Sequence, residues 1–176
     1  MDQRTQHEMI SILPRLRRFA VGLTRDSAQA DDLVQIACEK AIRQIHQWQY
    51  GTRLDSWMFR IIQTTHIDQL RAQKHRNSHL VNDQNQMPQY FDGENFIMAR
   101  LSLENVSKAL ENLTEDHRAV IMLVFVEGYP YKEAAEILNI PIGTLTSRLM
   151  RARNTLLQKA SANDSGLKPL PANTCG

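Results

Sequence analysis

The residues between Ile142 and Lys159 have the side chains needed to bind a polyanion. This stretch contains four basic residues and no acidic one, whereas residues 77–116 contain seven acids and two bases. The net charge of the whole chain is only +2, so the basic character is local. A concentrated basic helix is typical of a nucleic-acid-binding surface, although a solvated helical face has the same composition.

Apolar and polar side chains in this stretch are expected on opposite sides of a helix. An inward stripe has spacings of four, three and four residues: Leu145, Leu149, Ala152 and Leu156. The other side has groups able to hydrogen-bond base edges or contact a thymine methyl: Thr146, Ser147, Met150, Arg151 and Asn154. Groups placed to contact phosphates are Gly143, Thr144, Arg148 and Arg153. The alternative is a basic helix that only packs against its own domain.

A short helix and a tight turn precede this basic helix. The pattern predicts a helix over Tyr131–Leu138, a turn over residues 139–141 and the longer helix over residues 142–160. Asn139 tolerates the left-handed conformation that ends a helix, and Pro141 lies just before the next one. This arrangement is typical of a helix-turn-helix, whose second helix enters the DNA major groove.

The rest of the chain is predicted to be helical as well. Helical periodicity extends over residues 10–23, 28–48, 54–74, 94–113 and 115–127. Pro14 predicts a kink or a new first turn, Ser27 and Thr114 are expected N-caps, and Gly128 is expected to end its helix in the left-handed conformation. No alternating strand pattern occurs, so the predicted fold class is all-α.

The sequence predicts two small helical domains. Residues 77–94 are rich in Asn, Gln and Asp and have no sustained period, which predicts a flexible linker. The expected organisation is a domain over residues 1–76, the linker, a second domain over residues 95–160 and a flexible tail over residues 161–176.

Several classes of function have no support in the composition. Cys38, Cys175 and the six histidines show no metal-ligand spacing, so we expect no metal and no cofactor. No nucleophile–base set or Gly-rich phosphate loop indicates an enzyme. No apolar run reaches about 18 residues, and Met1 to Gln6 lack the order of a secretory signal, so we expect a cytoplasmic protein.

The C-terminal half resembles a known family in two motifs, EGYPYKEAAEIL (127–138) and PIGTLTSRLMRAR (141–153). They are similar to the sigma-four domain of extracytoplasmic-function (ECF) sigma factors of the sigma-70 family. The resemblance implies that the second helix reads the minus-thirty-five promoter element. Thr146, Ser147, Met150 and Arg151 would then face bases, and Thr144, Arg148 and Arg153 would mainly contact phosphates.

The N-terminal half independently resembles the sigma-two domain of the same family. DSAQADDLVQIACEKAI (26–42) is similar to the helix that docks on core RNA polymerase. The resemblance implies that Asp31, Asp32, Leu33 and Gln35 lie at that interface. From the residues alone, the two acids in a first helical turn are more often partners of the helix dipole than part of an interface.

Residues 53–76 (RLDSWMFRIIQTTHIDQLRAQKHR) look like the family's helix that captures and opens the minus-ten element. Opening DNA requires surfaces that stack unpaired bases and cations for the strand backbone. The candidate residues are Tyr50, Arg53, Trp57, Arg60, Thr64, Arg71, Lys74 and Arg76. Trp57 and Phe59 are more often core residues, and Thr64 stands where the family often has Asn, so the minus-ten preference is expected to differ.

The resemblance implies core RNA polymerase, promoter DNA and an anti-sigma factor as partners. Membrane contact would arise only through a membrane-bound anti-sigma factor. Two rival functions are an ordinary dimeric helix-turn-helix regulator, which leaves the N-terminal half without a role, and a sigma-like adaptor that binds an anti-sigma factor without initiating transcription.

Overall fold

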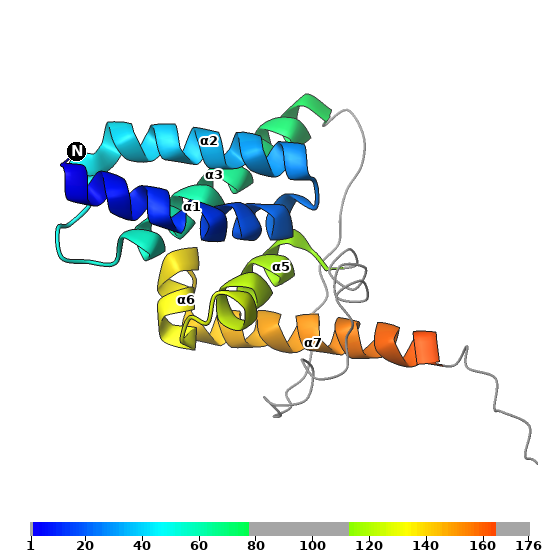
Figure 1. The fold of residues 1–176 in the computed structure, drawn as a ribbon. Helices are drawn as coiled ribbons and strands as arrows, with labels where there is room; N and C mark the ends of the chain where they lie inside the picture. Colours follow the sequence, from blue (N-terminus) through cyan, green and yellow to red (C-terminus); the bar gives the residue numbers. More distant parts are fainter. Residues whose placement is uncertain (1, 78–112, 165–176) are drawn as a thin grey trace, which may run out of the picture.

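The computed structural model describes residues 2–77 and 113–164, and every regular element in these ranges is helical. The N-terminal block consists of α1 (Gln3–Thr24), α2 (Ser27–Gln44), a short 3-10 turn η1 (Ile45–Gln47) and α3 (Leu54–Asn77). The C-terminal block consists of α5 (Glu115–Ile121), η2 (Met122–Val126), α6 (Tyr131–Leu138) and α7 (Ile142–Asp164). Figure 1 shows the first block lying against the second. The all-α prediction is confirmed; the predicted linker and most of the predicted helix over 94–113 lie outside the described residues.

The first helix buries most of the apolar stripe that its periodicity predicted, but Ile10 is 56% exposed and Leu13 is only partly buried. Its buried residues are Thr5, Met9, Ile12, Leu16, Phe19, Ala20 and Leu23. The Asp2 carboxylate caps the helix by accepting from the backbone N–H of Thr5 at 2.7 Å. Pro14 lies inside α1, which continues as a single helix to Thr24. The tertiary packing of its stripe therefore outweighs the hydrogen bond that proline removes.

The beginning of α2 differs from the prediction by one residue. Asp26, and not Ser27, is the N-cap, and its carboxylate accepts from the backbone N–H of Gln29 at 2.8 Å. The α-helix ends at Gln44 and a 3-10 turn follows, so the helix is shorter than the predicted 28–48. Within it, Cys38 is half-buried, and this burial raises the pKa of its thiol.

The C-terminal block begins as predicted, with the Thr114 side chain capping α5. The helix then widens into a π-turn, in which the backbone N–H of Glu127 donates to the backbone carbonyl of Met122 at 2.9 Å. Gly128 follows with φ +73°, as expected for a left-handed helix end. The π-turn was not predicted, because the apolar run of residues 119–126 has no periodic signal that distinguishes it from an α-helix.

The two blocks pack directly on one another and share one hydrophobic core. The buried guanidinium of Arg118 in α5 donates to the carbonyl of Leu23 at the end of α1, at 2.9 and 3.2 Å. Gly22 lies beside this contact and packs so closely on Met122 that a Cβ at this position would be 2.5 Å from the methionine sulfur. Phe59 of α3 lies edge-on to Phe19, with ring centroids 5.1 Å apart, and to Tyr129, at 5.7 Å. These contacts make the blocks one compact body.

Phe59→Ala should destabilise the whole protein, because Phe59 is fully buried where the two blocks meet. Removing a buried phenyl ring costs about 3–5 kcal/mol, which lowers the melting temperature by roughly 10 °C in a chain of this size. The measurement is thermal unfolding followed by circular dichroism. Tyr50→Ala is the control, since Tyr50 is 68% exposed and its removal should leave stability nearly unchanged.

Candidate nucleic-acid interface

The helix-turn-helix predicted from the sequence is present. Asn139 ends α6 with φ +53°. The backbone N–H of Ile140 then donates to the backbone carbonyl of Ala135 at 3.0 Å, which closes the turn. Then α7 begins with Leu145 N–H donating to Pro141 at 3.1 Å. The predicted inward stripe is buried in the C-terminal block: Leu145, Leu149, Ala152 and Leu156. This packing fixes which side of α7 remains available to a ligand.

The predicted base-facing residues of α7 are partly exposed: Thr146, Ser147, Met150 and Arg151. The Thr146 hydroxyl donates to the carbonyl of Ile142 at 2.9 Å, and that of Ser147 donates to Thr144 at 2.9 Å. Each hydroxyl oxygen can still accept a hydrogen bond. Asn154 is exposed one turn further on.

The arginines of α7 differ in how they are held. Arg148 forms an ion pair of 2.7 Å with Asp116 of α5, which ties its guanidinium to its own block. Arg151 and Arg153 have buried Nε atoms that make no hydrogen bond within the part of the chain that the structure describes. Burial lowers the pKa of the neighbouring His117, and the positive charge of Arg151 lowers it further. Cations that lack a full set of acceptors are suited to bind an anion.

The loop before α3 presents an aromatic side chain. Tyr50 is exposed and lies edge-on to Trp48, with ring centroids 5.9 Å apart. Gly51 turns the chain with φ +90°, and the Thr52 hydroxyl closes the loop by donating to the carbonyl of Gln49 at 2.7 Å. The loop therefore holds Tyr50 at the surface while Trp48 packs against the core.

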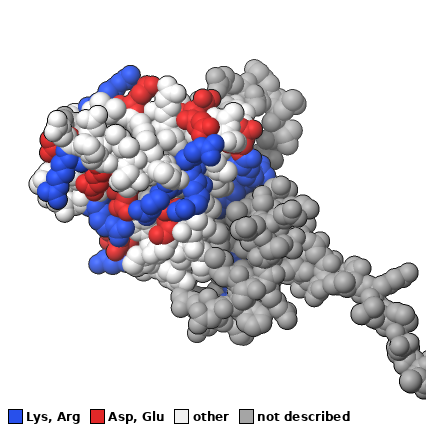
Figure 2. Space-filling model, viewed as in Figure 1, with Lys and Arg blue, Asp and Glu red and all other residues white. Residues whose placement is uncertain are grey.

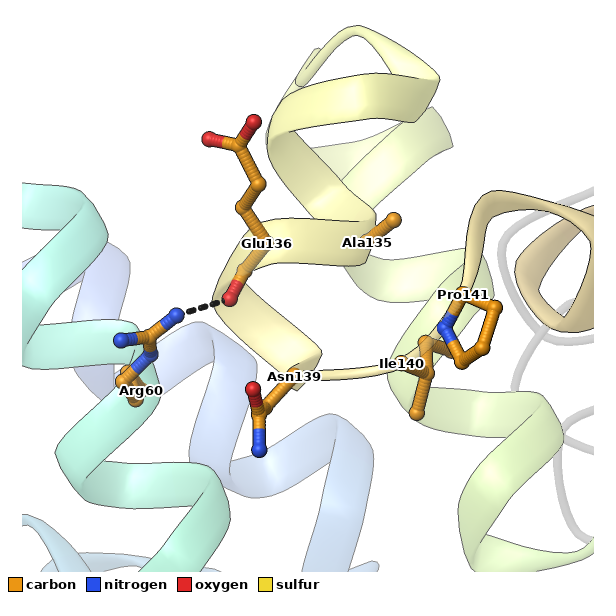
Figure 3. A pocket seen from close by; sticks show the side chains of 6 residues that line it. All are labelled: Arg60, Ala135, Glu136, Asn139, Ile140 and Pro141. Carbon is orange, nitrogen blue, oxygen red and sulfur yellow. Dashed lines mark hydrogen bonds between the residues drawn. The ribbon is translucent and has the colours of Figure 1, made fainter.

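Arg53, predicted as a DNA contact, is held by groups from both blocks. Its guanidinium pairs with Asp55 at 3.0 Å and with Glu133 of α6 at 2.8 Å. It also lies over the ring of Tyr129, 4.6 Å from the centroid. Two helical turns along, Arg60 reaches from α3 to donate to the backbone carbonyl of Glu136 (Figure 3). Two predicted DNA-binding cations, Arg53 just before α3 and Arg60 within it, thus contact the C-terminal block.

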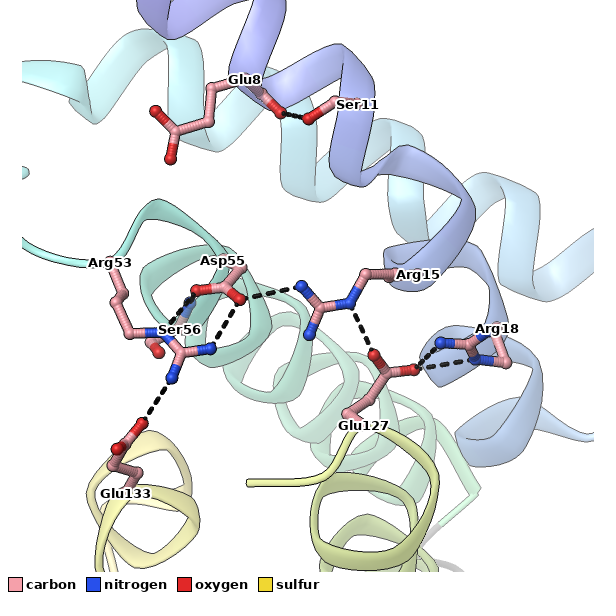
Figure 4. Close-up of polar contacts among 9 residues, drawn as sticks. All are labelled: Glu8, Ser11, Arg15, Arg18, Arg53, Asp55, Ser56, Glu127 and Glu133. Atoms are coloured by element: carbon pink, nitrogen blue, oxygen red, sulfur yellow. Dashed lines mark hydrogen bonds and ion pairs between the residues drawn. The ribbon is translucent and has the colours of Figure 1, made fainter. Parts of the chain in front are cut away.

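Asp55 and Glu127 join this site to α1 (Figure 4). Arg15 donates to Asp55 at 2.9 Å and to Glu127 at 2.9 Å, and Arg18 pairs with Glu127 at 2.8 Å. Burial alone would raise the pKa of Asp55, but hydrogen bonds, first of all from Arg53, outweigh it and hold that pKa well below its usual value. Burial raises the pKa of Tyr129 to about 12. The site is a network of fixed charges.

The remaining residues predicted for the minus-ten element have different surroundings. Trp57 is half-buried and packs against the core, whereas Thr64 is exposed and its hydroxyl donates to the carbonyl of Arg60 at 2.9 Å. Arg71 and Lys74 are exposed near the end of α3. The side chain of Arg76 lies outside the described residues. Phe59 is fully buried, which confirms its interpretation as a core residue.

A cleft between α3 and the C-terminal block brings together cations predicted for two different promoter elements. The cleft has a volume of about 360 Å³ and is lined by Arg71 and Lys74 of α3 and by Arg148 of α7. Figure 2 shows blue and red side chains alternating across the middle of the visible face, where the blocks meet. The boundary between the blocks is therefore strongly charged.

The face predicted to bind polymerase is mostly available, with one correction. Asp32 is exposed, Asp31 pairs with Arg17 at 2.6 Å, and Gln35 is exposed beside Glu39. The prediction for Leu33 is wrong in one respect: its side chain is fully buried in the N-terminal block. Leu33 belongs to the buried stripe of α2, spaced by three or four residues from Ala30 and Ala37, so it supports this face from beneath.

Sequence reasoning missed six residues of the charged boundary: Arg15, Arg18, Asp55, Glu127, Tyr129 and Glu133. Glu127, Tyr129 and Glu133 all belong to the motif EGYPYKEAAEIL, so they were noticed as part of a resemblance without a role of their own. Their partners are far away in the sequence. Helical periodicity does not indicate which residues pair when they are so far apart in the sequence.

Both halves of the chain match known sigma-factor domains. Residues 10–76 match the family described as sigma-70 region 2, and residues 103–156 match sigma-70 region 4. The chain is 30% identical over 149 residues to the ECF RNA polymerase sigma factor EcfG of Rhodopseudomonas palustris, covering 85% of this chain and 81% of that protein. The chain belongs to the ECF sigma factors of the sigma-70 family. The N-terminal block is its region 2, and the C-terminal block is its region 4.

Other relatives of this sigma factor support the same family assignment. It is 28% identical over 165 residues to the ECF sigma-E factor of Escherichia coli, covering 89% of this chain and 82% of that one. Its fold is similar to that of the sigma factor RpoE of Bartonella quintana, solved in complex with the anti-sigma factor NepR. That match has a TM-score of 0.72 and 30% identity, and it covers 91% of this chain and 98% of the other. Among the described helices, none is long and apolar enough to cross a membrane.

The depressed pKa of Asp55 predicts how stability depends on pH. A carboxyl whose folded-state pKa is lowered stabilises the fold above its unfolded pKa of about 3.9, and this stabilisation is lost as the pH falls below that value. Since hydrogen bonds to charged groups contribute about 1.5–3 kcal/mol, Asp55→Asn should lower the melting temperature by about 5 °C at pH 7.

The difference between wild type and Asp55→Asn should narrow steadily from pH 5 to pH 3 in thermal unfolding experiments. Asp68→Asn is the control, because Asp68 is largely exposed and lies 4.0 Å from its partner Lys40. A difference that stays constant down to pH 3 would contradict the role assigned to the Asp55 charge.

Proposed function

We propose that this sigma factor directs core RNA polymerase to promoters by gripping the minus-thirty-five element with α7 and opening the minus-ten element with α3 and the loop before it. The observation that supports this best is the helix-turn-helix, in which the buried stripe of α7 leaves one polar, basic side for DNA. The protein acts by binding and not as an enzyme, and its place of action is the cytoplasm.

On α7, Thr146, Ser147, Met150 and Arg151 read base edges. Arg151 is the strongest candidate, since it is partly exposed on the polar side of α7 and a guanidinium can bind guanine through two hydrogen bonds. Thr144, Arg148 and Arg153 contact phosphates and set the position of the helix. Arg148 exchanges Asp116 for a phosphate when DNA binds.

In region 2, the exposed ring of Tyr50 stacks on an unpaired base and the cations of α3 follow the strand backbone. Arg53, Arg60, Arg71, Lys74 and Arg76 supply these cations. Thr64, exposed midway along α3, contacts a base, and Trp57 supports the surface from its half-buried position.

The polymerase-binding face lies on α2. Asp32, Gln35, Ile36 and Glu39 follow one another at helical spacing, and all are exposed. Ile36 is one of the exposed large apolar side chains, so this face combines an apolar contact with acidic groups. Asp31 adds its charge beside them, and the buried Leu33 fixes the orientation of the helix.

An anti-sigma factor is a further partner of this chain. The proposal is supported by the RpoE structure of Bartonella quintana, which was solved with the anti-sigma factor NepR and covers nearly the whole of this chain. Contact with a membrane arises only where the anti-sigma factor is itself membrane-bound.

Run-off transcription tests the proposal. With core bacterial RNA polymerase and a library of promoter fragments, the protein should produce transcripts that polymerase alone does not. Arg151→Ala should reduce them about tenfold or more, because one bidentate base contact contributes about 1–3 kcal/mol of discrimination. Arg4→Ala is the control, since Arg4 is exposed at the start of α1. Binding to an anti-sigma factor without any transcript would favour the adaptor function instead.

A separate experiment tests the polymerase-binding face. A double substitution, Asp32→Arg with Ile36→Arg, should abolish co-purification with core polymerase and leave the melting temperature nearly unchanged, because both residues are exposed. The control is Ile10→Arg, which places the same charge at an exposed apolar residue of a different helix, α1. Equal polymerase binding by the three proteins would contradict the assignment.

A further inference from the structure

The cleft between α3 and region 4 has the size of a small-molecule site. Its volume of about 360 Å³ lies within the range of pockets that hold organic ligands, roughly 300–1,000 Å³. On one side it is lined by residues that recur at spacings of three and one, along a single face of α3: Gln63, His66, Ile67, Leu70, Arg71 and Lys74. The other side belongs to α5, α6, the turn after it and α7. Both regions therefore contribute to this cleft.

Two buried side chains of this lining have unused hydrogen-bonding atoms. Gln63 is 5% exposed and His66 is 6% exposed. Among the described residues, neither Oε1 of Gln63 nor Nε2 of His66 has a hydrogen-bond partner. Folded proteins rarely leave buried polar atoms unpaired, because the hydrogen bonds lost to water are then not replaced. The two residues are neighbours on the wall of a cleft that can hold a ligand, so a ligand is their expected partner.

These atoms indicate the kind of ligand. Burial lowers the pKa of His66, so its imidazole is neutral at pH 7 and has one N–H donor and one acceptor. The Oε1 atom of Gln63 can only accept. A ligand edge with an N–H group beside a second polar atom complements both. Nucleobases have such edges, and their apolar faces suit the partly buried Ile67, Leu70 and Ile140 of the lining.

The charges of the cleft favour an anionic group. Arg148 and Asp116 neutralise one another in an ion pair of 2.7 Å. Arg71 and Lys74 are exposed, and neither has an ion-pair partner in the part of the chain that the structure describes. These two cations can bind a phosphate through charge-assisted hydrogen bonds. The half-buried carboxylate of Glu115 also lines the cleft and can accept from hydroxyl groups such as those of a ribose.

We propose that this cleft is a binding site for a nucleotide. The base contacts Gln63 and His66 and packs on the apolar wall. The ribose contacts Glu115, and Arg71 and Lys74 bind the phosphate. Neither region has the complete site, because the base and phosphate contacts come from region 2 and the ribose contact comes from region 4. The site does not depend on the proposed function, since nucleotide binding requires neither polymerase nor promoter.

Isothermal titration calorimetry of the full chain tests the site in the absence of polymerase and DNA. The probes are AMP, GMP, CMP and UMP, and the controls are the corresponding nucleosides and inorganic phosphate. At least one nucleotide should bind with a Kd on the order of 10 µM, the usual affinity for a ligand of this size. Its nucleoside and inorganic phosphate should each bind at least about tenfold more weakly, because each makes only part of the contacts.

Two outcomes of the titrations would overturn the proposal. The first is no binding of any of the four nucleotides at millimolar concentration. The second is binding of inorganic phosphate as tightly as the nucleotides, because the cleft would then be a site for an anion alone.

Lys74→Gln tests the phosphate contact. It removes one cation from the cleft, so the Kd for the nucleotide should rise about tenfold. Lys132→Gln is the matched control, because Lys132 is exposed on α6 and does not line the cleft. Equal Kd values for the two variants would count against the site.

Gln63→Leu tests the base contact. Leucine has a similar shape and no polar atom, so the substitution removes an unpartnered acceptor from the interior. The ligand-free variant should melt a few degrees higher than the wild type, and its Kd for the nucleotide should be about tenfold higher. Gln69→Leu, at an exposed position of α3 outside the cleft, should change neither quantity.

The two readouts of Gln63→Leu separate a nucleotide from a buried water. A higher melting temperature with an unchanged Kd for the nucleotide would overturn the proposed base contact, because water would then be the partner of the buried atoms. Circular dichroism verifies folding. If Gln63→Leu does not fold, the comparison of Lys74→Gln with Lys132→Gln still decides.

Discussion

The carboxylate of Glu127 is buried between Arg15 and Arg18, and much of the structure depends on this contact. An unpaired buried charge is strongly unfavourable, so the end of the π-turn must lie against α1. The chain then reverses at Gly128 and places Tyr129 against Phe59. The position of α6 over α3 follows, and with it the contacts of Arg53 and Arg60.

The same geometry makes α3 a helix with two sets of partners. Its apolar side belongs to the core of region 2, while its cations contact region 4 or line the cleft beside Arg148. Several of the cations predicted to contact DNA have an intramolecular oxygen beside them: Arg53 has Glu133, Arg60 has the Glu136 carbonyl and Arg148 has Asp116. In the proposed function, these cations exchange their intramolecular oxygens for phosphates when the promoter binds.

Local signals predicted most elements, and the errors have local causes. The Thr114 cap, the left-handed Asn139 and the buried stripe of α7 were all predicted, because each depends on residues within a few positions of one another. Asp26 caps α2 in place of Ser27, since both residue types suit that position. Leu33 was assigned to a surface by resemblance, although its place in the helical stripe buries it.

By itself, the sequence determined the all-α class and the helix-turn-helix and predicted the residues for DNA binding, because helical periodicity and turn chemistry act over short distances. Only the tertiary structure decided which of those residues are free. Arg15 meets Glu127, and Arg53 meets Glu133, across more than 75 residues of chain in each case. Such pairs form only when packing of the apolar faces has brought the two regions together, and no short-range pattern encodes that step.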